Sequence, residues 1–217
     1  MATPPTPTAA TPQPNPITIR LPSKYTPSTP ATTTFTPPPL PFLHRTWSVT
    51  HSTLTMWRTA RNVRITYGPL PPGSTAPPRA RLSDTVEYEP LAGSAGRPKR
   101  VSGTDTTGTP GDTGAWDWRG RGWLFWVGSH WEVLGWGEWE DPATRVRERW
   151  VVTWFRETVF TEEGVDVYFE RREGGSEGLV RAVLAELRRV ARGCGRLERL
   201  LEGEMREVSV VLPWAER

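Results

Sequence analysis

The chain has 217 residues and a formal net charge of only +3, spread as single charges, so it is long enough for one folded domain and lacks the basic runs of nucleic-acid-binding proteins. A single cysteine, Cys194, excludes an intramolecular disulfide and a cysteine metal site, and we expect no metal and no other cofactor. No apolar run approaches a membrane span or a secretory signal, so we expect a cytoplasmic protein without a membrane partner. Organelle targeting by the N-terminus and a homodimer stay open.

Residues 1–42 are almost entirely Pro, Thr, Ala and Ser. Such a segment has few large apolar groups whose burial would offset the entropy lost on ordering. The composition therefore predicts a disordered Pro/Thr-rich arm over residues 1–42.

Between residues 43 and 172 the pattern changes to short segments of β type separated by Gly, Pro and Asp. In residues 61–67, for example, Val63, Ile65 and Tyr67 share one face of the expected strand. Eight or nine such segments are typical of a sandwich or a closed antiparallel barrel. The expected strands cover residues 45–56, 61–67, 82–89, 99–106, 116–119, 123–127, 132–138, 149–159 and 165–171.

Two of these segments are apolar on both faces. Residues 123–127 read WLFWV, and residues 149–159 alternate Trp150, Val152 and Trp154 with Val151, Thr153 and Phe155. A strand of this kind is expected to lie between the barrel interior and a covering helix.

Residues 173–217 change to the helical period. Ser176 is a suitable N-cap for a helix whose apolar stripe includes Leu179, Val183 and Leu187, and Gly193 and Gly195 would end it. We expect this amphipathic helix, followed by a shorter one, to cover the barrel.

A strand-rich domain with a Trp on its first strand and an amphipathic helix after its last resembles the calycin superfamily, the lipocalins and their relatives. In lipocalins, a Gly-x-Trp motif on the first strand plugs the barrel floor with its Trp, and an Arg from the last strand stacks over it. Here the corresponding residues are Arg45, Thr46 and Trp47, without the Gly, and Arg171 would be the stacking cation.

Within residues 45–192, the strings WSVTHSTLTMWRTARNVRITY, SHWEVLGWGE and ERWVVTWFRETVFTEEGVDVY resemble a group of uncharacterised fungal lipocalin-like proteins. The resemblance implies a mainly β fold, a single antiparallel calycin-like β-barrel of about eight or nine strands with the C-terminal amphipathic helix packed on it. It implies no particular activity.

Seven of the twelve tryptophans lie between Gly114 and Glu140. Such a concentration indicates either a heavily aromatic core or a cavity for a flat apolar ligand. The leading hypothesis is a non-catalytic protein that binds a small apolar or aromatic molecule in a Trp-lined barrel cavity. Arg64 would pair with a ligand carboxylate if it entered the barrel, and otherwise it is exposed. The expected ligand-binding residues are Trp47, His51, Arg64, Trp118, Trp126, Trp136, Trp150 and Trp154.

The alternative is a cofactor-free enzyme, of isomerase or dehydratase type, on the same barrel. Strand alternation puts His130 and Glu132 on one face, where a carboxylate beside an imidazole makes an acid/base pair. In the competing interpretation, His130 ends a strand and Glu132 faces solvent. The two functions differ in whether this pair faces an enclosed space.

Overall fold

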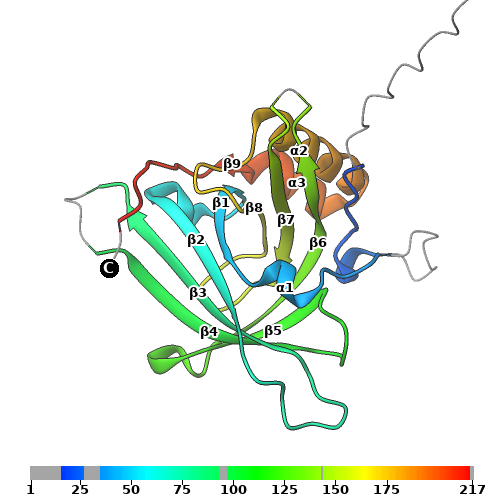
Figure 1. Ribbon diagram of the computed structural model, residues 1–217, viewed down its shortest axis with the longest axis vertical. Helices are drawn as coiled ribbons and strands as arrows, with labels where there is room; N and C mark the ends of the chain where they lie inside the picture. The colour runs from blue at the N-terminus through cyan, green and yellow to red at the C-terminus, as the bar shows by residue number, and fades with distance from the viewer. Residues whose placement is uncertain (1–15, 27–34, 93–96, 143, 216–217) are drawn as a thin grey trace, which may run out of the picture.

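A computed structural model describes residues 16–26, 35–92, 97–142 and 144–215 (Figure 1). Eight antiparallel strands follow one another around a closed barrel, and β1 closes it by pairing with both β2 and β8. The expected mainly β barrel fold is thereby confirmed. The strands are β1 (Thr46–Ser52), β2 (Ala60–Pro69), β3 (Arg81–Pro90), β4 (Lys99–Thr107), β5 (Ala115–Gly120), β6 (Gly128–Glu140), β7 (Arg147–Phe155) and β8 (Gly164–Phe169), and a two-residue strand, β9 (Arg206–Glu207), lies beside β1.

Two helices cover one side of the barrel, as the helical period predicts. Ser176 caps α2 (Glu177–Ala191) by accepting a hydrogen bond from the backbone N–H of Leu179, and α3 (Gly195–Glu204) follows. The stripe residues of α2 are buried in one cluster with the outward-facing residues of β7 and β8, among them Trp150 and Trp154. Figure 1 shows the two helices together beside β6 and β7. The double coverage expected of residues 149–159 is therefore present.

One end of the barrel is closed by the short helix α1 (Leu40–Leu43). The indole N–H of Trp47, which is fully buried, donates to the Leu43 carbonyl at 3.1 Å. The cation over the Trp47 ring is Arg45, at 5.4 Å, and not Arg171, which lies beyond the end of β8 and pairs with Glu173 at 2.8 Å. The stacking position that the lipocalin pattern assigns to Arg171 is thus occupied by Arg45, which directly precedes β1.

Strand β1 contains a bulge that changes which face His51 occupies. The register against β8 shifts between Val49 and His51. Trp47 and Val49 face the interior, and after the shift the next inward residue is Ser52, which bonds a cavity acid on β8. His51 lies outside, near β9 and α2, because the bulge interrupts the alternation of the strand.

The expected strand at residues 123–127 is wrong. The segment forms the 3-10 turn η3 (Gly122–Leu124) and an exposed loop between β5 and β6, entered through Gly122 at φ +63°. Trp123 and Phe125 are 76 % and 70 % exposed, whereas Leu124 and Val127 are buried. The apolar run belongs to the rim of the barrel and not to a sandwiched strand.

Part of the expected disordered arm packs on the barrel. Ile19 is buried and forms a β-bridge with Gly135 of β6. Two buried carboxylates hold the segment that follows. Glu132 accepts from the Ser23 backbone N–H at 3.0 Å, and Glu163 accepts from the Lys24 ammonium at 3.1 Å and from the Tyr25 hydroxyl at 2.5 Å.

Residues 35–42 also lie against the barrel, where the Thr36 carbonyl accepts from the Trp136 indole at 2.8 Å. Residues 1–15 and 27–34 of the expected arm lie outside the described residues. Hydrogen bonds to buried side chains, which composition does not reveal, explain the order of the described segments.

Deletion of residues 1–26 should therefore lower the thermal unfolding midpoint by several degrees, because it removes the burial of Ile19, the pairing of Arg20 with Glu132 and the pairing of Lys24 with Glu163. Calorimetry measures the shift. Deletion of residues 1–15, which keeps every contact named above, is the matched control. Equal midpoints for the two deletions would show that residues 16–26 do not stabilise the barrel.

A candidate ligand cavity in the barrel

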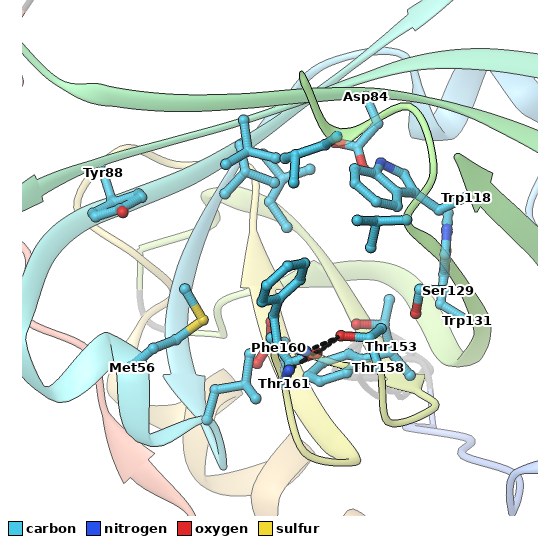
Figure 2. Close-up of a pocket in the computed structure, with 18 of the residues that line it drawn as sticks. Met56, Asp84, Tyr88, Trp118, Ser129, Trp131, Thr153, Thr158, Phe160 and Thr161 are labelled. Atoms are coloured by element: carbon cyan, nitrogen blue, oxygen red, sulfur yellow. Dashed lines mark hydrogen bonds between the residues drawn. The ribbon is translucent and has the colours of Figure 1, made fainter. Parts of the chain in front are cut away.

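The interior of the barrel contains a cavity of about 400 Å³. Apolar and aromatic side chains make most of its wall, and Figure 2 shows Phe160, from the loop between β7 and β8, projecting into the space between the walls. Asp84 and Trp118 lie together on one side, and Tyr88 and Met56 lie on the opposite side (Figure 2). The size is within the range of sites for small organic molecules, roughly 300–1,000 Å³.

Three rings stack inside the barrel, and two of them, Tyr67 and Trp131, line the cavity. Trp131 lies between Tyr67 and Trp116, with ring centroids 5.5 Å and 5.7 Å away and nearly parallel planes. Trp118 extends across β4, where Gly103 leaves room for its ring: a Cβ at position 103 would lie 2.0 Å from the indole nitrogen of Trp118. The absence of a side chain at Gly103 thus lets Trp118 reach Asp84.

Two acids from adjacent strands, Asp84 of β3 and Asp105 of β4, are buried in the barrel. The Trp131 indole donates to Oδ1 of Asp105 at 2.8 Å, but Oδ2 of Asp105 and Oδ1 of Asp84 have no hydrogen-bond partner. Burial raises the pKa of Asp84 to about 7 and outweighs a hydrogen bond from Trp118. Burial, together with the charge of Asp84, raises the pKa of Asp105 well above its usual value. The pair therefore holds at least one proton near neutral pH.

A third acid, Asp166 of β8, also lines the cavity. Ser52 donates a hydrogen bond to it, and burial raises its pKa to about 7. Close by, the hydroxyl of Tyr168 accepts from Thr153 at 3.0 Å, and burial raises the pKa of Tyr168 well above its usual value. Because Tyr168 interacts with both Asp84 and Asp166, the three acids and the tyrosine form one polar region in an otherwise apolar cavity.

Among the described residues that line the cavity there is no Lys, Arg or His. Leaving a buried polar group without a partner costs about 1–3 kcal/mol. The free oxygens of Asp84 and Asp105 are thus a local destabilisation, and a ligand that brings hydrogen-bond donors would relieve it.

Of the expected ligand-binding residues, Trp118 lines this cavity. Trp47 and Trp136 are at the closed end, where Trp136 contacts Phe42 edge-on at 4.7 Å. Trp150 and Trp154 face outward, beneath the helices. Strand alternation separates these indoles between the two faces of the barrel wall.

The other three expected residues also lie away from the cavity wall. Arg64 lies on the outer face, donates to the Ala215 carbonyl at 2.9 Å and stacks on Trp214 at 5.1 Å, so its place is with the C-terminal segment and not with a ligand carboxylate. His51 lies outside the barrel, as described above. Trp126 is 53 % exposed and packs on Phe160 at the rim.

The proposed acid/base pair does meet, but on the outer face of β6. Nε2 of His130 lies 3.7 Å from Glu132, Nδ1 lies 2.9 Å from Asp117, and Arg20 approaches Glu132 at 2.8 Å. Burial would raise the pKa of Glu132, yet the bonds from His130 and Ser23 and the charge of Arg20 lower it to about 2. Hydrogen bonding to Glu132 raises the pKa of His130 against the opposing effect of burial. The pair acts as an ionic anchor for the N-terminal segment and does not line the cavity.

The acids of the cavity were not identified from the sequence, because strand alternation was applied to the apolar residues and to His130 and Glu132 but not to Asp84 or Asp166. Asp84 lies two residues from Leu82 and from Val86, both of which face the interior, so its inward orientation follows from the same period. Asp166 stands between Val165 and Val167 in a strand that is buried throughout. An acidic residue on the apolar face of an expected strand was the sequence pattern that could have indicated an acid inside the barrel.

The chain was compared with known proteins, and no family model and no curated protein matches it. In the part of the chain that the structure describes, no helix is long and apolar enough to cross a membrane. The same residues contain no group of three or more His, Cys, Asp or Glu side chains placed to hold a metal ion. Among the features of the described residues, the geometry of the cavity carries the most information about function.

The raised pKa of Asp84 predicts a pH-dependent stability. An unfolded Asp ionises near about pH 4, whereas Asp84 in the folded protein keeps its proton up to about pH 7. The folded state binds more protons in this interval, so the free energy of unfolding falls as the pH rises through it. Urea unfolding should show the wild type losing stability relative to Asp84→Asn between about pH 5 and pH 8.

The control for this experiment is Glu162→Gln, which removes a charge from an exposed position in the loop between β7 and β8. It should leave the pH dependence of the wild type unchanged. If Asp84→Asn also left it unchanged, Asp84 would ionise normally in the folded protein and would not be buried as described.

Proposed function

We propose that the protein binds a small, largely apolar aromatic molecule in the cavity of its barrel. The observation that carries the proposal is the coincidence of an aromatic wall with a compact polar region in one cavity of about 400 Å³. Apolar walls supply most of the affinity in such sites, and a few polar groups fix the orientation of the ligand. A calycin-like barrel is compatible with this function.

The rim of the barrel offers a route of entry. Trp123 and Phe160 belong to two loops at the open end, are 76 % and 60 % exposed, and contribute to the cavity lining. Near them, Trp126 packs on Phe160, and exposed apolar side chains that lie together in this way mark surfaces that contact a ligand or a partner. We infer that these two loops contact a ligand as it enters.

Catalysis by His130 and Glu132 is the weaker candidate. Both side chains are held by charged partners on the outer face, and neither lines the cavity. Binding without chemistry is therefore the function that the geometry supports best.

A cavity-filling variant tests the proposal. Val101 lines the cavity from β4, and Val101→Trp would occupy part of the space with an indole. N-phenyl-1-naphthylamine, a neutral fluorescent probe of apolar sites, should bind the wild type saturably and bind the variant at least about 10-fold more weakly, which corresponds to about 1.4 kcal/mol.

The matched control is Val146→Trp, since Val146 is exposed in the turn between β6 and β7. It should bind the probe as the wild type does. Absence of saturable binding to the wild type, or equal binding by Val101→Trp, would contradict a hollow ligand-binding barrel.

A further inference from the structure

The chemical class of the ligand can be inferred from the charge of the cavity. Asp84 lines the cavity, is 8 % exposed, and has one oxygen without a partner, and Asp105 behind it is fully buried with one free oxygen. Buried carboxyl oxygens normally accept hydrogen bonds. Once Asp84 has lost its proton, its free oxygen is an acceptor in the cavity wall, and a ligand group that brings donors would satisfy it.

The charges of the side chains that line the cavity argue against an anionic ligand. Asp84 and Asp166 line it, whereas its described lining contains no Lys, Arg or His. A ligand carboxylate or phosphate would lie near these acids without a cation to pair with it. Fatty acids and other anionic lipids are thus poorly suited to the space.

The aromatic wall suits a cation. Trp118 and Trp131 line the cavity beside the acids, and indole faces attract ammonium groups more strongly than other aromatic rings do. Carboxylates and aromatic rings together are the two kinds of group that bind an organic ammonium in a site closed to water. Both are present at the same side of the cavity (Figure 2).

We propose that the ligand is an aromatic amine in its protonated form, with the ammonium group against Asp84, behind which Asp105 lies, and the aromatic part among the apolar walls. This proposal rests on the proposed binding function and specifies its ligand class. The described groups that interact with Asp84 are Asp105, Tyr67, Tyr168 and Trp118, and none of them is a cation. The ligand would supply the missing positive charge.

The test is calorimetric titration of the wild type near about pH 8, where the Asp84 carboxyl is ionised before the ligand arrives. Three compounds share one naphthyl skeleton and differ in charge: 2-(1-naphthyl)ethylamine, 2-(1-naphthyl)ethanol and 1-naphthylacetate. The amine should bind at least about 10-fold more tightly than the alcohol, and the carboxylate should bind most weakly. Affinity for the amine should fall as the pH is lowered through about 7, since Asp84 must lose its proton.

Asp84→Asn should reduce the affinity for the amine to about that of the alcohol. Glu162→Gln, which removes an exposed charge, should bind all three compounds as the wild type does. The wild-type series decides the question even if Asp84→Asn does not fold.

The outcomes separate this proposal from the proposed function. If the alcohol or the carboxylate binds as tightly as the amine, the ligand class is wrong while the binding function stands. If none of the three compounds, nor the neutral probe described above, binds saturably, the binding function itself is wrong.

Discussion

The pairing of β1 with both β2 and β8 is the constraint on which the rest of the structure depends. Because the barrel is closed, each strand residue faces either the interior or the outer surface. The tryptophans of the strands are therefore distributed between these two faces. Trp116 and Trp131 stack inside the barrel, whereas Trp150 and Trp154 make the outer surface on which the helices pack. A chain with so many indoles can thus have both a dense outer core and a cavity.

The buried acids on the outer and inner faces of the barrel wall differ in their hydrogen-bond partners and in the direction of their pKa shifts. On the outer face, Glu163 has four partners, including the Trp154 indole at 2.8 Å and the Arg196 guanidinium at 3.1 Å. The donors come from segments that cover the barrel from outside, and they lower the pKa of Glu163 although burial alone would raise it. Inside, Asp84 and Asp105 keep free oxygens and raised pKa values. This contrast, within one molecule, is the main reason to regard the inner acids as functional.

Much of the fold could be predicted from local patterns. The period of residues 61–67 placed Val63, Ile65 and Tyr67 on one face, and the cap at Ser176 fixed where α2 begins. The patterns failed where a single residue altered the period or the role of a segment. The bulge after Val49 turned His51 outward, and the apolar run at residues 123–127 lines the rim of the barrel because a turn at Gly122 interrupts the strand. Neither event leaves a periodic signal.

The candidate site was less predictable than the fold. Tryptophan clustering indicated an aromatic interior, but which indoles face inward depends on register, and Trp118 is the expected residue that lines the cavity. His130 and Glu132 do share a face, yet alternation alone does not say which face is the outer one. Asp84 lies on the same face of β3 as Leu82 and Val86, and Asp166 lies in the fully buried strand β8, so the inward orientation of both could have been derived. The packing of residues 16–26 on the barrel depends on carboxylates that are distant in sequence, so it could not have been derived from local patterns.

The most direct measurement is a crystal structure of the protein with 2-(4-bromophenyl)ethylamine, in which anomalous scattering locates the bromine. The account predicts that the compound lies inside the barrel, with its nitrogen about 3 Å from a carboxyl oxygen of Asp84 and its ring among the aromatic walls. An interior filled by protein side chains, or a compound bound with its nitrogen directed away from Asp84, would contradict the account.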